Sequence, residues 1–156
     1  MALSLNIDGF TTSMSSMLAE IANGIPDIIQ IIALDAKALI RNRIQEKGLN
    51  AEEQELDGYS PGYKKKKEKA GKYRGFTDMT LTGDMWRKTE TISAEQRGHK
   101  YVVTVGGKDQ LSENKIEWNS EHYGDILEVS SKEEQLLEQT MDDEIQKIID
   151  QNGFGQ

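Results

Sequence analysis

The first 48 residues carry apolar positions at helical spacing. One set falls at i, i+4, i+7, i+8 and i+11, which places it on one face of a helix: Phe10, Met14, Met17, Leu18 and Ile21. A second set follows the Asn23-Gly24 pair: Ile28, Ile32, Ala36, Leu39 and Ile40. Pro26 suits a first helical turn, and Gly48 suits a C-terminal cap. The pattern predicts either a helical hairpin or one long helix kinked at Gly24.

Residues 49–80 show little periodicity and contain turn-forming glycines together with Pro61. The segment also holds the aromatic residues Tyr59, Tyr63, Tyr73 and Phe76. Disordered tails are poor in aromatic residues. We therefore expect an extended loop that becomes ordered mainly against partners.

The pattern changes to short strands after residue 80. Thr82-Gly83-Asp84 predicts a turn that begins one short helical turn through Met85 and Trp86. Alternation and β-branched residues predict strands over 89–93 and, most clearly, over 100–105. Residues 116–118 and 124–129 are expected to add shorter strands, which gives a small antiparallel sheet.

A helix is expected to close the chain from about residue 131 to 152. Ser131 with Glu134 forms a capping-box pattern, and Ser130 with Glu133 offers an alternative register. The buried stripe is expected to be Leu137, Met141, Ile145 and Ile148. The sequence thus predicts a single α+β domain with this helix packed on the sheet, divided into N-terminal helices (1–48), a loop (49–80), a sheet (81–130) and a C-terminal helix (131–152).

Charge is distributed unevenly along the chain. The net charge is −8, yet the segment 64–74 holds seven of the 19 basic residues and one acid, Glu68. The rest of the chain is therefore strongly acidic and repels nucleic acid as a whole. A basic segment on an acidic body can dock on an acidic patch of a like subunit or of another protein.

Several classes of site lack support. The chain has no cysteine, which excludes disulfides and thiolate metal sites. The start has no basic region followed by an apolar run, so no secretory signal is expected. The apolar run 28–34, interrupted by Gln30, is too short to cross a bilayer. A metal site would need ligands beyond His99 and His122, and no nucleophile elbow or phosphate-binding glycine loop is present. We expect no cofactor and no enzymatic activity.

The ordered motifs resemble those of tailed-phage neck and tail-completion proteins, the small virion proteins at the head–tail joint. The matching pieces are Asp57-Gly58-Tyr59-Ser60-Pro61, the lysine run from Tyr63 to Lys69, Leu81-Thr82-Gly83-Asp84-Met85-Trp86, the His122-Tyr123-Gly124 region, and the segment 127–131 that enters the last helix. The resemblance covers roughly residues 36–149. The helix before Gly24 departs from the pattern.

The resemblance implies a structural virion protein that forms a ring of six or twelve copies between portal and tail. Rings of this kind use heterologous contacts that close by rotation. The implied partners are further copies of the chain and the adjacent portal, neck or tail proteins, with transient contact to genomic DNA in the channel and none to a membrane. The implied location is the virion, after assembly in the host cytoplasm.

The basic segment leaves three hypotheses open: a solvated loop, a docking arm on an acidic neighbour, or a DNA contact. The alternative function is accordingly a nucleic-acid-associated module. The candidate partner-binding residues are Lys64, Lys65, Lys66, Lys67, Lys69, Lys72, Arg74, Tyr59, Tyr63, Tyr73 and Trp86. Trp86 and Trp118 are each expected in the core or, where exposed, as interface anchors.

Overall fold

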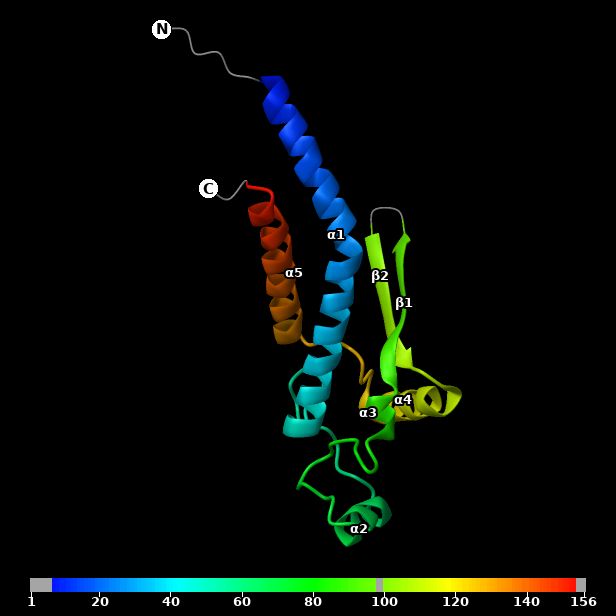
Figure 1. Ribbon diagram of the computed structural model, residues 1–156. Coiled ribbons are helices and arrows are strands. Elements are labelled where there is room, and N and C mark those ends of the chain that lie inside the picture. Colours follow the sequence, from blue (N-terminus) through cyan, green and yellow to red (C-terminus); the bar gives the residue numbers. More distant parts are fainter. Residues whose placement is uncertain (1–6, 98–99, 154–156) are drawn as a thin grey trace.

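The molecule is elongated and is built around one long helix (Figure 1). The computed structural model describes residues 7–97 and 100–153, with side chains described for 15–90 and 104–153. The elements in order are α1 (Ile7–Asn42), the π-helical turn η1 (Arg43–Lys47), α2 (Pro61–Lys69), α3 (Asp84–Arg87), β1 (Thr89–Arg97), β2 (Lys100–Gly107), α4 (Gln110–Tyr123) and α5 (Ser131–Gln151). The fold is α+β and mostly helical.

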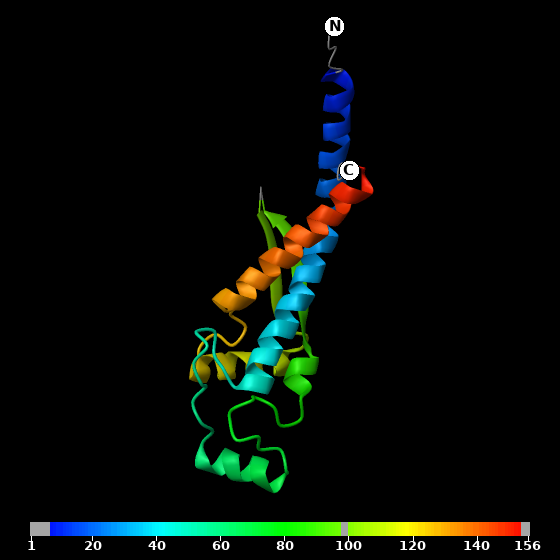
Figure 2. The same ribbon diagram turned by 90° about the vertical axis from the view of Figure 1, so that its left-hand side faces the viewer.

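Helix α1 lies between α5 and the two-stranded sheet and contacts both. Its N-terminal part projects beyond the rest of the molecule, and α2 lies at the opposite end; Figure 2 shows the same arrangement from a perpendicular direction. The C-terminal helix therefore packs on α1 instead of on the sheet, where the sequence placed it. The reason is that α1 already contacts both strands of the sheet, and that Gly24 of α1 lets Ile148 of α5 approach closely.

The N-terminal residues form one continuous helix, and no hairpin forms. Gly24 and Pro26 both lie inside α1. Gly24 permits close packing, since a Cβ placed there would lie 2.5 Å from Ile148 Cδ1 of α5. The helix passes into η1 and ends at Gly48, whose φ of 67° is the left-handed conformation predicted for a C-terminal cap.

From Ser15 to Lys47 the chain is helical, long and apolar enough to cross a membrane by length and composition alone. The sequence-based expectation considered only the short run 28–34. This criterion is weak evidence, because the core helices of soluble proteins also meet it. In this structure the helix buries Ile28, Ala33 and Ile40, but only 11% of its most apolar 18-residue stretch is buried inside the protein.

The segment 49–80 is not the extended loop that was expected. It contains α2, which begins after the N-cap Ser60 with Pro61 in its first turn. Three of the lysines lie in its last turn, where cations interact favourably with the helix dipole. The helix carries no apolar stripe, so hydrophobic periodicity could not reveal it.

The sheet has two strands among the described residues, not three or four. Strands β1 and β2 pair antiparallel, from Thr89 opposite Gly107 to Arg97 opposite Lys100, with a shift in register between Thr91 and Ser93. The predicted strand 116–118 is part of helix α4, and 124–129 is irregular. Asp109 is the N-cap of helix α4, and its carboxylate accepts hydrogen bonds from Ser112 N at 2.8 Å and Ser112 Oγ at 2.6 Å.

Helix α5 begins in the alternative register. Ser130 is the N-cap, and it forms a reciprocal capping box with Glu133. Glu133 also accepts a hydrogen bond at 2.9 Å from Arg43 Nε, and both side chains are buried. This buried ion pair ties the end of the long helix to the start of α5. Asn152 and Gly153 follow the last turn, as predicted.

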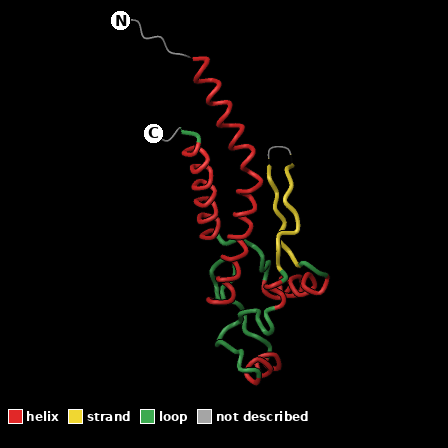
Figure 3. The backbone as a smooth tube through the Cα atoms, in the orientation of Figure 1, coloured by secondary structure: helices red, strands yellow, loops and turns green. Residues whose placement is uncertain are grey.

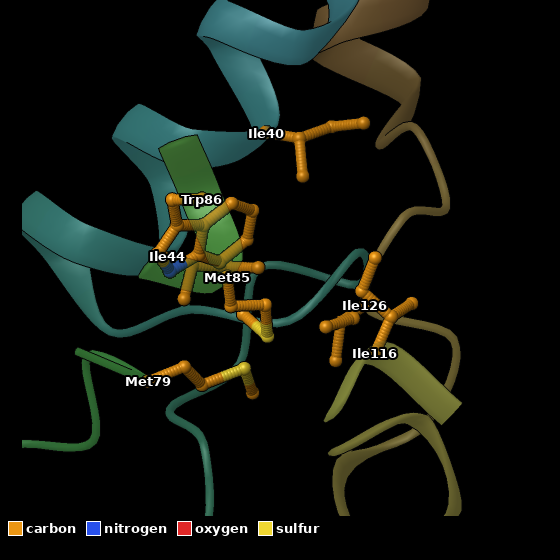
Figure 4. Packing of buried hydrophobic residues seen from close by; sticks show 7 residues of the cluster. All are labelled: Ile40, Ile44, Met79, Met85, Trp86, Ile116 and Ile126. Atoms are coloured by element: carbon orange, nitrogen blue, oxygen red, sulfur yellow. The ribbon is translucent and has the colours of Figure 1, made fainter. Parts of the chain in front are cut away.

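The main core lies where the lower part of α1, η1, α3 and α4 meet (Figure 4). Its members are Ile40, Ile44, Met79, Met85, Trp86, Ile116 and Ile126. The Trp86 side chain is 2% exposed, which confirms its placement in the core. Its indole Nε1 has no hydrogen-bond acceptor among the described residues.

Candidate partner-binding surface

The lysine-rich segment forms a compact unit at one end of the molecule. Figure 3 shows α2 between two loops that connect it to the helical body. Five of the seven basic residues lie on α2, and Lys72 and Arg74 follow in the returning loop. The structure therefore fixes which positive charges face solvent and which are used inside the fold.

Lys67 holds α2 to the body and is not available to a partner. Its side chain is 0% exposed, and its Nζ forms a buried ion pair with the Asp78 carboxylate. The same Nζ donates hydrogen bonds to Thr80 O at 2.6 Å and to Tyr59 OH at 3.2 Å. All of these contacts of the Lys67 ammonium group lie within the chain.

Tyr59 completes this buried cluster. Its hydroxyl donates to Asp78 Oδ1 at 2.8 Å and accepts from the backbone nitrogens of Asp78 (3.1 Å) and Met79 (2.8 Å). Burial raises the pKa of the Tyr59 phenol above its ordinary value, and the hydrogen bond and charge of Asp78 raise this pKa further. Tyr59, Lys67, Asp78 and Thr80 thus form the lysine clamp, a connection between α2 and the loop that returns to the core.

Two further basic residues are engaged within the chain. Lys72 Nζ donates to Leu81 O at 2.7 Å. Arg74 binds both carboxylate oxygens of Glu46, at 3.2 and 2.8 Å, and also donates to Gln45 O at 2.7 Å. Since these side chains are exposed, the Arg74–Glu46 pair contributes little stability. It still reduces the charge that this part of the segment presents to a partner.

Four lysines of α2 remain exposed: Lys64, Lys65, Lys66 and Lys69. At about 100° per residue, Lys65, Lys66 and Lys69 fall within roughly 100° around the helix axis. Lys67 lies on the opposite side, where it enters the clamp. We call these three residues the lysine face of α2. Lys64 points elsewhere, and its Nζ lies 5.0 Å from the ring centroid of Tyr73.

The aromatic candidate residues also differ in how far they are exposed to solvent. Tyr63 is 36% exposed on α2, whereas Tyr59 and Tyr73 are half-buried. Trp86 is buried, so its assignment as a partner-binding residue is wrong. Trp118 is 54% exposed on α4, with its ring centroid 4.3 Å from that of His122. The exposed tryptophan on the described surface is therefore Trp118, at a position that the sequence could not separate from the core.

The described residues offer little for chemistry. They contain no group of three or more His, Asp or Glu side chains that could hold a metal ion. His99 lies outside the described residues. A pocket of about 460 Å³ lies between η1 and the loop 71–82, and its charged lining residues Glu46, Lys72, Arg74 and Asp78 already bond within the chain.

No protein-family model, curated protein or solved structure matches this chain.

Proposed function

We propose that this chain is a structural subunit of a tailed-phage neck or tail-completion ring that joins portal and tail. The proposal keeps the motif resemblance of the sequence and adds the geometry of α2. Its partners are further copies of the chain and the neighbouring portal, neck or tail proteins. It acts by shape and charge complementarity, and no catalytic step is part of the proposal.

The observation that carries the proposal is the buried lysine clamp. Burying an ammonium and a carboxylate together has a large desolvation cost, which is offset only when the geometry is good and the remaining hydrogen bonds are made. Here Lys67 and Asp78 are both buried and both have further partners. The clamp holds a helix without an apolar stripe in a fixed position, so that the lysine face is preorganised before a partner arrives.

The distribution of charge supports a protein partner. The lysine face belongs to a chain with a net charge of −8. Electrostatic complementarity between a basic element and an acidic body increases association rates and orients the partners. A ring subunit needs two different contact surfaces, one for each neighbour, and an elongated molecule with a basic end meets that need.

Negative-stain imaging of the purified protein, alone and mixed with the portal of the same phage, tests the proposal. The expected images contain rings with rotational symmetry, whose mass is six or twelve times 17.6 kDa. Particles that stay monomeric at all concentrations and do not associate with the portal would contradict it.

A further inference from the structure

A shallow groove with an acidic rim runs between α1 and α5. It has a volume of about 350 Å³ and is lined by Asp35, Ala38, Leu39, Leu136, Gln139, Thr140 and Asp143. Leu39 and Leu136 supply apolar surface, and Asp35 and Asp143 supply two carboxylates. No basic residue lines it. Among the residues with described side chains, neither carboxylate forms a salt bridge.

Exposed apolar side chains extend this groove. Leu136 is 49% exposed, and on α1 Leu34 and Ile31 are 60% and 36% exposed. Ile31, Leu34 and Ala38 are three or four residues apart, so they share one side of α1. Ala38 and Leu136 line the groove beside the two carboxylates, and Leu34 and Ile31 continue the apolar side of α1 from Ala38. We call the groove together with this apolar side of α1 the α1–α5 groove.

We propose that the α1–α5 groove receives the lysine face of α2 from a second copy of this chain. This inference rests on the proposed function and specifies the contact between neighbouring subunits. Lysine side chains have an aliphatic stem and a charged head. Their stems would cover Leu136 and Leu34, while their ammonium groups would reach Asp35 and Asp143. The occupant thus matches both the apolar and the acidic parts of the groove.

Like charge opposes a symmetric dimer in which the grooves of two copies face each other. If two copies paired groove to groove, Asp35 and Asp143 of one copy would face the same carboxylates of the other. Like charges brought together in this way oppose association. Duplex DNA is disfavoured for the same reason, since its phosphates would meet these carboxylates.

The contact must form between molecules. Helix α2 lies at one end of the chain, and α5 runs from the middle of the molecule away from that end (Figures 1 and 2). The lysine face of a copy therefore cannot reach the groove of the same copy without rearrangement. Because the two surfaces differ, the contact is heterologous, and repetition of it closes a ring or extends a filament.

Charge reversal with rescue tests this inference. The variants are K65E/K66E/K69E on α2 and D35K/D143K in the groove, with E138K/D142K as a control on another side of α5. The control makes the same change in net charge as the groove variant. Self-association of each purified protein is measured by sedimentation velocity at low and moderate salt, and far-UV circular dichroism checks that each variant folds.

Each of the first two variants should weaken self-association roughly tenfold or more, because exposed ion pairs are replaced by repulsion. The five-fold variant that combines them should regain most of the lost affinity, since the charges are then exchanged between the surfaces. E138K/D142K should stay close to wild type. Higher salt should weaken the wild-type contact.

Three results would overturn the inference. If the wild type forms rings and both reversal variants do so equally well, the subunits meet through other surfaces, and only this inference fails. If the wild type stays a monomer of 17.6 kDa with and without portal, the proposed function fails as well. If K65E/K66E/K69E abolishes binding to a 20-base-pair DNA duplex and leaves self-association unchanged, the lysine face is a nucleic-acid contact.

Discussion

Replacement of Lys67 by methionine tests the lysine clamp directly. Methionine has a similar length and removes only the charged head. The variant leaves the Asp78 carboxylate, which is 3% exposed, without its countercharge, and leaves Thr80 O without the donor at 2.6 Å. Removing one partner of a buried ion pair typically costs about 3–5 kcal/mol. The whole free energy of unfolding of a domain is about 5–15 kcal/mol.

Hydrogen exchange followed by mass spectrometry measures the effect where it arises. A loss of about 3–5 kcal/mol corresponds to roughly 100-fold or faster exchange of the amides of α2 and of the loop 71–80. Equilibrium unfolding in urea, followed by circular dichroism, reports whether the core loses stability as well. The exchange measurement is the more direct one, because α2 lies at the end of the molecule and can open separately.

Lys65→Met is the matched control. It makes the same chemical change on the same helix at an exposed position, and its effect should remain within about 0.5 kcal/mol. The double variant K67M/D78N removes the uncompensated carboxylate and should recover a large part of the lost protection. Equal exchange in K67M and K65M would refute the clamp. A double variant as unstable as K67M would show that the charge of Asp78 is not the cause.

Three further changes test other parts of the structure. Trp86→Ala should lower the free energy of unfolding in urea by roughly 3–5 kcal/mol. Trp86→Phe should lower it by less, because the indole nitrogen that it removes has no hydrogen-bond acceptor among the described residues. Equal losses in the two variants would contradict the packing of Trp86 in the core. Gly107→Ala should lower the free energy of unfolding by about 1–3 kcal/mol, because the added Cβ would lie 2.4 Å from Glu113 N of α4. Gly62→Ala is the control, because the space around Gly62 is open. Hydrogen bonds from Lys88 and Ser112 hold the pKa of Asp109 below its usual range. The stabilisation that Asp109 contributes is therefore present above about 4, the pKa of an aspartate in the unfolded chain, and it is lost as the pH falls through the lower pKa of the folded state. The difference in melting temperature between wild type and Asp109→Asn should shrink as pH falls from about 7 to about 2, and a difference independent of pH would contradict this assignment.

The sequence predicted the elements whose local signals are strong. The helical residues up to Gly48, the turn before Met85, the two paired strands and the last helix were all found where turn and capping residues indicated them. Gly48 is an example: its place after a basic last turn predicts a left-handed cap, and its φ is 67°. Such signals involve only residues close together in the sequence, so they can be recognised without knowledge of the tertiary fold.

Other elements were missed because their signals are not local. Helix α4 buries only Ser112 and Ile116, and it exposes Leu111 and Trp118, so its apolar pattern resembled a short strand. Helix α2 has no buried apolar residue at all and is held by the lysine clamp. A long-range ion pair leaves no periodic trace in the sequence.

The candidate site was predicted in part. The sequence identified the basic segment but treated its seven charges as equivalent. Once α2 is recognised as a helix, the spacing of its lysines separates the lysine face from Lys67, which points the other way. The partners of Lys67, Thr80 O and the Asp78 carboxylate, become known only from the structure. The α1–α5 groove has no sequence motif, because its lining residues come from helices about 100 positions apart.

Light scattering coupled to size-exclusion chromatography tests the central claim most directly. At low salt the wild-type protein is predicted to elute with a mass several times 17.6 kDa, and K65E/K66E/K69E is predicted to elute as the folded monomer. Wild type and variant that both remain monomeric, or that assemble equally well, would contradict the account of this chain as a subunit joined through its lysine face.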